Sequence, residues 1–318
     1  MHKYLIIIIT ISLGISADYA SYSGAFLRMG TSARSLAMGS GFTAEIDQGF
    51  SAYHNPASIA FLNKRQLAFS HHALNLDRRL MMSSISTGLP PTAGLGVAWV
   101  SSGVDNIQGR STSGKKTENI DGTDQILSTS EDAIFISFAQ RITPWLALGI
   151  NVKILRHQLP MNESQLAGKG TGFDIGFLVL PEEKFRFAFM IQDLNTNYQW
   201  NTGKVFEGEG RVYKESFPIM YRLGTTFTFQ RIYFVGDIGV VANQDDILGV
   251  TMRFGGEYQL TEKYFIRGGF GNSRFSLGAG LNFTFLNLND AFFDYAVVIE
   301  PHSASQGMIH VFTYAFNF

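Results

Sequence analysis

Apolar residues recur at every second position along most of this chain, from Gln66 to the C-terminus. A period of two is typical of β-strands with one apolar face, whereas an amphipathic helix repeats about every 3.6 residues. The alternation predicts about fourteen strands, each near the length of about 9–11 residues that a membrane-spanning strand needs. We place them near residues 66–73, 80–87, 94–101, 132–141, 146–157, 171–180, 185–192, 218–229, 232–240, 249–260, 264–271, 275–283, 292–299 and 308–318.

The second face of these strands is polar but carries little charge. It presents Gly, Ala, Ser and Asn, and charged residues make up 16% of the whole chain, against about 25% in soluble domains. Turning the charges toward lipid would cost about 2–4 kcal/mol for each basic residue, and on the order of 20 kcal/mol in total. We therefore expect nine charged side chains to line a lumen as mutually paired groups: Lys153, Asp174, Arg186, Arg222, Asp237, Arg253, Glu257, Arg267 and Asp294.

The connections between the predicted strands alternate in length. Tight inner turns are expected at 88–93, 142–145, 181–184, 229–231, 261–263 and 284–291. Longer outer loops are expected at 102–131, 158–170, 193–217, 241–248 and 300–307, with one tight outer turn at 272–274. This alternation is typical of outer-membrane barrels, which have short periplasmic turns and longer outer loops. The sequence thus predicts an all-β fold, a transmembrane antiparallel up-and-down β-barrel.

The last strand carries a more specific signal. The segment 308–318 alternates aromatic residues on one face and stops on Phe: Phe312, Tyr314, Phe316 and Phe318. Such an ending resembles the C-terminal recognition signal of bacterial outer-membrane barrels. Pairing of this strand with the first one would close the wall and remove the exposed edges.

The N-terminal segment 1–17 has the layout of a secretory signal peptide. His2 and Lys3 precede an apolar run over 5–13, and small residues close the segment, with cleavage expected after Ala17 or Ala20. The run is too short to span a bilayer as a helix, which needs about 20 apolar residues. We expect an exported protein of the bacterial outer membrane.

Between this segment and the barrel, residues 18–65 are expected to form a small hatch in the lumen. Residues 21–65 lack the period of two and contain a dense run of small residues over 30–41. A short helix is expected over 32–38, ended by Gly39. A second helix is expected to start at Asn55, as N-cap, with Pro56 at its first position.

The hatch segment also resembles the N-terminal signature of a known family, the PorV/PorQ family, within the FadL-like β-barrel superfamily. The resemblance rests on the block GTSARSLAMG and on the later HNPAS: Gly30, Arg34, Met38, Gly39, Asn55, Pro56 and Ala57. It implies a FadL-like barrel with the N-terminal segment inside as a hatch. It also implies a place in the type IX secretion system, in which PorV-like members act as outer-membrane shuttles for secreted cargo proteins.

Patterns that carry chemistry are scarce. The chain has no Cys, which excludes thiol chemistry and a zinc–cysteine site. The adjacent His71 and His72 point to opposite faces of a strand, and no metal-ligand or phosphate-loop spacing is present. We expect no enzyme, no cofactor and no metal, and the formal charge of −1 gives no attraction to nucleic acid. Trp99, Trp145 and Trp200 fall near predicted strand ends, as interfacial aromatics do.

Two functions remain open. The main interpretation is a secretion-associated component whose long outer loops, 102–131 and 193–217, dock cargo proteins or secretion-machinery subunits, because partner recognition tends to lie on long loops. The alternative is a FadL-like channel for a hydrophobic small molecule held between hatch and wall. The glycine-rich lumen faces of 94–101 and 275–283 favour the alternative. Outer-membrane lipid is an expected partner in both.

Overall fold

The computed structural model describes residues 22–46, 49–111, 113–119, 124–160, 165–204, 210–285, 288–299 and 307–318. The predicted signal peptide, with Ala17 and Ala20, lies outside the described residues.

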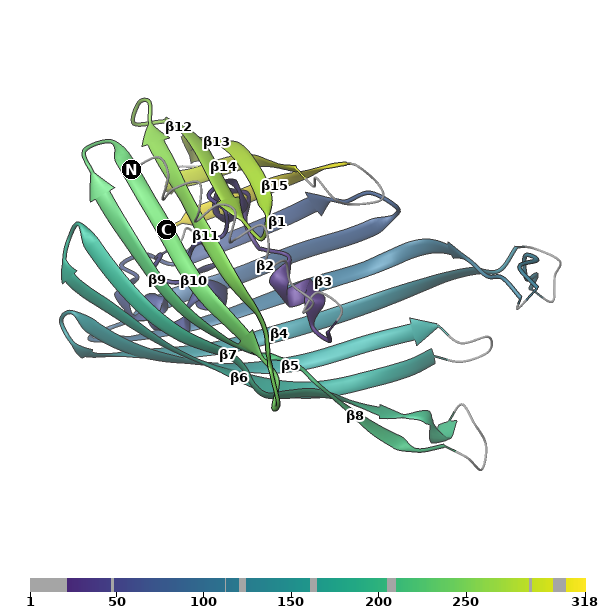
Figure 1. The fold of residues 1–318 in the computed structure, drawn as a ribbon. Coiled ribbons are helices and arrows are strands. Elements are labelled where there is room, and N and C mark those ends of the chain that lie inside the picture. The colour runs from purple at the N-terminus through teal and green to yellow at the C-terminus, as the bar shows by residue number, and fades with distance from the viewer. Residues whose placement is uncertain are drawn as a thin grey trace, which may run out of the picture.

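The body of the molecule is a single closed sheet of antiparallel strands (Figure 1). Fourteen strands form the wall, which the pairing of β6 with β7 closes, and among the described strands β8 pairs only with the far end of β7. The strands are β1 (Gln66–Ala73), β2 (Arg78–Leu89), β3 (Ala93–Gln108), β4 (Ile126–Thr143), β5 (Leu146–Pro160), β6 (Gln165–Glu182), β7 (Phe185–Asn201), β8 (Val212–Ser216), β9 (Ile219–Phe229), β10 (Ile232–Ala242), β11 (Ile247–Gln259), β12 (Tyr264–Gly271), β13 (Arg274–Phe285), β14 (Leu288–Ile299) and β15 (Met308–Asn317).

The predicted barrel is confirmed, and every predicted strand is present. The prediction of long outer loops is wrong in part, because β3, β4, β6 and β7 continue beyond their predicted ends. Much of 102–131 and 193–217 therefore forms hairpins that extend past the wall, including the pair of β7 with β8. The connections β2–β3, β4–β5, β6–β7, β9–β10 and β11–β12 lie together at one end of the barrel, here called the turn end. The extended hairpins lie at the other end, the loop end, together with the short connections β1–β2, β10–β11 and β12–β13 (Figure 1).

Burial alternates along each strand, as the sequence pattern predicts. On β4, for example, Ala133 and Phe135 face the interior while Ile134 and Ile136 are exposed on the outer face. Exposed large apolar side chains recur on the outer face around the wall, which gives the barrel the apolar belt of a membrane-spanning protein.

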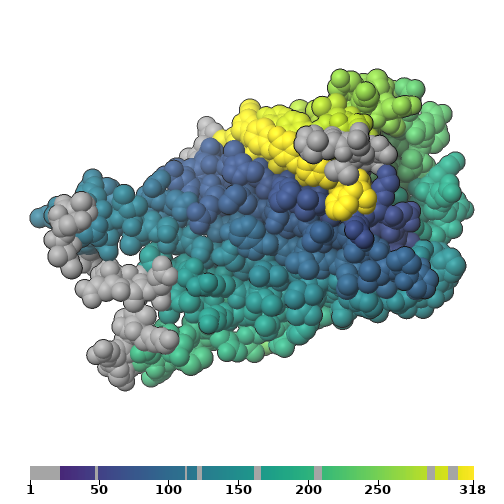
Figure 2. Space-filling model, turned by 180° about the vertical axis from the view of Figure 1, so that it is seen from behind, coloured from purple at the N-terminus to yellow at the C-terminus, as the bar shows by residue number. Residues whose placement is uncertain are grey.

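The two ends of the sheet meet along a single seam. β1 and β15 pair in full antiparallel register, from Gln66 opposite Asn317 to Ala73 opposite His310, and they lie side by side in Figure 2. The backbones of Arg65 and Phe318 exchange two further hydrogen bonds, both of 2.9 Å. The aromatic side chains Phe312 and Tyr314 lie on the outer face of this seam, opposite His71 and Phe69.

Removal of the segment 308–318 should therefore prevent assembly of the barrel. The truncated chain would leave the ladder groups of β1 and β14 unpaired in lipid, and each unsatisfied group there costs several kcal/mol. Heat-modifiable migration of the membrane fraction on a gel measures the folded barrel, and we expect none. Deletion of the equally long segment 109–119, which follows β3 in the chain, should leave the folded form intact; equal loss in both variants would contradict the seam as the cause.

Residues 22–46 and 49–65, here called the hatch, lie inside the barrel and form short helices (Figure 1). Ser32 and Ser35 form a capping box at the start of α2, and Asn55 caps η3 with Pro56 as the first residue. The hatch helices are η2 (Ala25–Arg28), α2 (Ala33–Ala37), α3 (Ser51–His54) and η3 (Pro56–Phe61), and a further single turn, η4 (Thr202–Lys204), lies in the β7–β8 hairpin. None of the helices among the described residues is long and apolar enough to cross a membrane.

Candidate functional site: the interface between hatch and barrel

Glycines of the wall receive the backbone of η3 near the turn end. A Cβ atom built on Gly149 would overlap the backbone of Pro56 and Ala57, and one built on Gly176 would overlap the side chain of Asn55. Gly94 and Gly88 face the carbonyl groups of Ile59 and Leu62 in the same way. Glycine is needed at these positions because any side chain would occupy the space of the hatch backbone.

A second group of wall glycines receives the end of α2. A Cβ atom on Gly255 or Gly269 would overlap the backbone of Met38 and Gly39. Gly39 itself has a φ of 68°, the left-handed conformation that ends α2. On β13, Gly278 faces Ala37.

The glycine-rich lumen face was interpreted from the sequence as a surface for a small molecule. The structure corrects this interpretation, because the hatch occupies that surface: Gly94 faces Ile59, Gly96 faces Ala52, and Gly278 faces Ala37. In this conformation, the hatch packs directly against these glycines.

A chain of alternating charges joins the hatch to strands β7, β11, β12 and β14 of the wall. The Arg34 guanidinium of α2 lies 2.8 Å from Glu45 and 3.1 Å from Glu257. Beyond Glu257, Arg267 lies 2.5 Å from that carboxylate and 2.5 Å from Asp294. At the other end Glu45 lies 3.2 Å from Arg186 and accepts a hydrogen bond from Tyr233. Three arginines and three carboxylates thus form one neutral network.

The Arg34 guanidinium is also enclosed by aromatic rings. It lies 5.3 Å from the ring centre of Phe42 and 5.6 Å from that of Tyr233, and Arg34 is only 6% exposed. Burial of charges is tolerated only where partners compensate for lost hydration, so the loss of one partner is costly.

The other lumen charges also lie on the inner face, where they form hydrogen bonds with neighbouring groups of the hatch and the wall. Asp237 accepts hydrogen bonds from the backbone and hydroxyl of Thr43, at 3.1 and 2.6 Å. Arg253 donates to the Asn272 side chain at 3.1 Å, and Arg222 donates to the Met220 sulfur at 2.9 Å. Hydrogen bonds to hatch and wall residues thus accompany these charges in the lumen.

Lys153 lies in a second charged cluster, between two carboxylates. Its ammonium is 2.6 Å from Asp174 and also contacts Asp193. Asn151 donates hydrogen bonds of 3.0 Å both to Asp174 and to the carbonyl of Ala52, so this cluster too is tied to the hatch. Asp193 reaches Lys153 because β7 is irregular here: its register against β6 shifts, and Asp193 has a φ of 65°.

Asn55, of the Asn-Pro-Ala element, joins three segments. Its Oδ1 accepts a hydrogen bond of 3.0 Å from the backbone of Ala57, which caps η3. Its Nδ2 donates to the carbonyl of Thr43 in the hatch at 3.0 Å and to that of Phe177 in β6 at 3.1 Å. The side chain is fully buried.

We expect Asn55→Ala to loosen the hatch. The change removes an N-cap and leaves buried carbonyls short of a donor, at a combined cost of about 2–4 kcal/mol. Amide hydrogen exchange over 57–61 measures the effect, and protection there should fall. Asn243→Ala removes comparable contacts to Asp245 and Asp246 from an exposed loop and should leave the hatch protected; unchanged protection in Asn55→Ala would contradict the assigned role.

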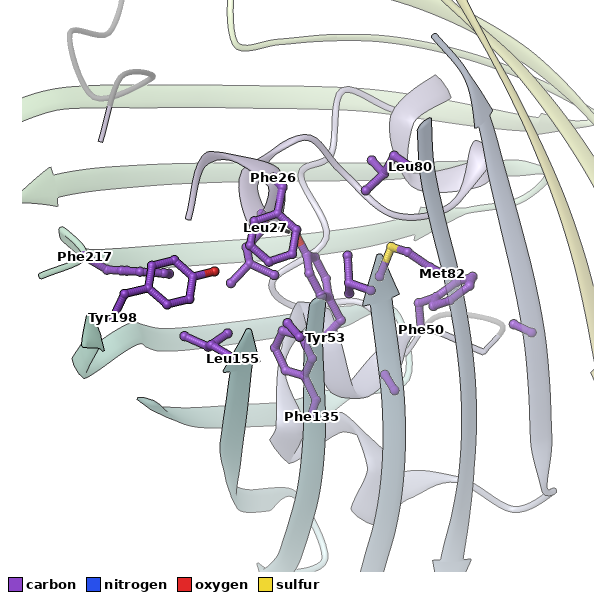
Figure 3. Close-up of a cluster of buried hydrophobic side chains, with 14 of the residues drawn as sticks. Phe26, Leu27, Phe50, Tyr53, Leu80, Met82, Phe135, Leu155, Tyr198 and Phe217 are labelled. Carbon is purple, nitrogen blue, oxygen red and sulfur yellow. Dashed lines mark hydrogen bonds between the residues drawn. The ribbon is translucent and has the colours of Figure 1, made fainter. Parts of the chain in front are cut away.

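Toward the loop end, the hatch meets the wall in an apolar cluster, here called the aromatic cluster (Figure 3). Trp200 belongs to it: the side chain is 8% exposed and packs against Tyr198, so its predicted interfacial position is wrong. Trp99 and Trp145 are exposed on the outer face as predicted. The Tyr198 hydroxyl is buried and makes no hydrogen bond with the described residues. The cluster contains Phe26, Leu27, Tyr53, Phe135, Leu155, Tyr198, Trp200 and Phe217.

The structure brings several of the sequence-derived site residues together and adds others. Arg34, Glu257 and Arg267 meet in one network. Gly30 precedes α2, has a φ of 102° and lies against the side chain of Leu36, outside that network. Sequence reasoning missed Glu45, Tyr233 and Asp193, and no local pattern marks them as contacts. Among the described residues, no group of three or more His, Asp or Glu side chains is placed to hold a metal ion.

No family model and no curated protein matches the sequence. Solved structures do match in fold. The toluene transporter TbuX of Ralstonia pickettii aligns with a TM-score of 0.62 at 13% identity, over 91% of this chain and 98% of that one. The toluene transporter TodX of Pseudomonas putida gives 0.62 at 14%, again over 91% and 98%. A Pseudomonas aeruginosa FadL homologue gives 0.60 at 12%, over 91% and 98%. The chain therefore has a FadL-like fold.

Proposed function

We propose that this protein is a non-enzymatic channel of the bacterial outer membrane that admits hydrophobic small molecules and is closed by its hatch. The observation that carries the proposal is a FadL-like barrel whose lumen is filled by a separate N-terminal segment bound through polar contacts. Two of the structural relatives are toluene transporters by name, which supports an apolar substrate.

The loop end offers an entrance of suitable chemistry. A hollow of about 370 Å³ lies there, between Tyr22, Thr196 and Phe217, and carries polar groups such as Asn195 at its rim. Phe217 belongs both to this hollow and to the aromatic cluster. Ligand sites of this kind combine apolar walls with a few polar groups. A molecule entering here reaches apolar side chains above the hatch, with the Tyr198 hydroxyl as a hydrogen-bonding group.

Passage beyond the aromatic cluster requires movement of the hatch. The wall glycines are in contact with the hatch backbone, so at these positions there is no free space between hatch and wall. Both polar contacts, such as that of Arg34 with Glu257, and apolar packing in the aromatic cluster hold the hatch, so its movement must break both kinds of contact.

Uptake of radiolabelled toluene and oleate by cells that lack other such channels tests this function. Cells that produce the protein should take up at least one of the two faster than cells that do not, and Phe217→Ala should lower the rate. Phe229→Ala, which removes an exposed aromatic ring on the outer face, is the matched control. Equal uptake with and without the protein would overturn the proposal.

A second candidate function, of the PorV/PorQ type in type IX secretion, is favoured by the β7–β8 hairpin together with the hatch motif Gly30–Gly39. β8 is an edge strand that pairs with β7 alone among the described strands, and its Val212 and Tyr213 are exposed. Free strand edges can accept a strand of a partner protein. Replacement of 202–216 by a short turn should then abolish co-purification of cargo bearing a common C-terminal sorting domain. Retained cargo would count against this candidate.

A further inference from the structure

A row of basic side chains crosses the outer face of the wall near the loop end. The strand registers place Arg156 opposite Lys169, Lys169 opposite Gln199, and Gln199 opposite Lys214. Residues directly opposite each other in a sheet point to the same face. These four side chains, here called the cationic row, are all exposed, and at about 4.8 Å per strand the row extends about 14 Å.

The cationic row lies at the upper border of the lipid-facing belt. On β5 the outward positions from Leu146 to Ile154 are apolar, and Arg156 is the next one. On β6 the outward positions from Val179 to Phe173 are likewise apolar, and Lys169 follows beyond Thr171. On each strand the basic residue lies ten residues beyond the first apolar position. For a tilted strand this distance corresponds to about 25 Å along the membrane normal, which is the height of the apolar band of such barrels.

The charges of the row are not neutralised by their neighbours. Among the described residues, none forms an ion pair or hydrogen bond with the side chain of Arg156, Lys169 or Lys214. The strand registers place one acid beside the row, Asp132 of β4, which lies opposite Arg156. The Asp132 carboxylate also accepts a hydrogen bond of 3.2 Å from Trp99 of the next strand, β3. Three bases and this single acid leave the row with a net charge of +2.

A hollow accompanies the row. It has a volume of about 640 Å³ and is lined by Ile154, Arg156, Lys169, Thr171 and Gln199, among others. Its lower side is apolar and continuous with the lipid-facing belt, while its upper side carries the guanidinium and ammonium groups. An anionic lipid matches this arrangement, because its negatively charged headgroup would lie against the basic groups and its acyl chains against the apolar side.

We infer that the cationic row binds the phosphate groups of an anionic glycolipid in the outer leaflet, whose acyl chains lie along Ile154 and Phe173. Arg156 offers a planar pair of donors to phosphate, and Lys169 and Lys214 add point charges. The inference rests on the outer-membrane location in the proposed function and is independent of channel activity.

Native mass spectrometry of the full chain in neutral detergent tests this inference, with diphosphorylated lipid A as the probe. The triple variant Arg156→Gln, Lys169→Gln, Lys214→Gln should lose affinity on the order of 100-fold, because each basic residue near an anionic surface contributes about fivefold. The matched control neutralises exposed bases at the turn end, Lys184→Gln, Arg231→Gln and Lys263→Gln, and should bind as the unmodified chain does.

Two further probes identify the source of the binding energy. Lipid A stripped of both phosphates should bind as weakly as the row variant binds the intact lipid, and inorganic phosphate should bind far more weakly than lipid A. Equal binding by the row variant and the unmodified chain would overturn the inference, as would equal losses in both triple variants. Phosphate binding as tight as that of lipid A would assign the row to a free anion. Uptake is not measured, so failure here leaves the channel function untouched.

Discussion

Gly255→Leu should open the barrel. The side chain would project into the backbone of Met38, which cannot move aside by changing a rotamer. Overpacking of this kind costs about 1–3 kcal/mol, and a clash with backbone belongs at the upper end. The population of barrels with a displaced hatch should therefore rise roughly 100-fold. Ion conductance in planar bilayers and sensitivity of cells to large hydrophilic antibiotics both measure it.

The neighbouring residue provides a matched control. Gly256 lies in the same strand but on the outer face, where a Cβ atom would meet only ordinary contacts with Phe234 at 3.6 Å. Gly256→Leu changes the backbone propensity of β11 in the same way and adds the same side chain, so it should leave the barrel closed. Equal conductance of the two variants would show that the hatch does not depend on close approach to the wall.

Arg34→Met should release the hatch through electrostatics. The variant leaves Glu45 and Glu257 buried with one basic partner fewer each and gives the network a net charge of −1. Removal of one partner from a buried ion pair costs about 3–5 kcal/mol. Because the chain has no Cys, Ser58→Cys provides a unique and fully buried label site in the hatch. In the Arg34→Met background, the rate at which maleimide labels this cysteine should rise on the order of 100-fold or more.

A second substitution separates charge from packing. Glu257→Gln in the Arg34→Met background restores neutrality, since Arg267 keeps Asp294 and Arg186 keeps Glu45. The double variant should label more slowly than Arg34→Met alone, which is the coupling that a double-mutant cycle measures. Faster labelling in the double variant would rule out charge imbalance as the cause of release.

The wall of the barrel follows from the sequence because its signal is local. Alternation fixes which side of each strand meets lipid, and a shift of one residue would move every side chain to the wrong face. The signal fails where the register shifts: β7 is irregular around Asp193 and Asn195, both with positive φ. The alternation breaks there, so the strand was predicted to end at 192, and Trp200 was assigned to the membrane interface.

The interior is predicted less completely because its contacts join distant segments. Glycines on the lumen face indicate only that something approaches closely, and both a ligand and a hatch satisfy that requirement. The pairing of Arg34 with Glu257 joins positions 223 residues apart, and no spacing in the sequence indicates it. The caps of the hatch helices were predictable, since the signals at Ser32 and Asn55 are local.

A reversible crosslink between hatch and wall tests the central claim, that the hatch fills the lumen and must move for passage. A Cβ atom on Gly96 would lie 3.3 Å from that of Ala52, close to the separation in a disulfide. In Ala52→Cys, Gly96→Cys we expect oxidation to form the disulfide and to reduce hydrocarbon uptake to the level of cells without the protein, and reduction to restore it. Undiminished uptake by the fully crosslinked protein would contradict the account.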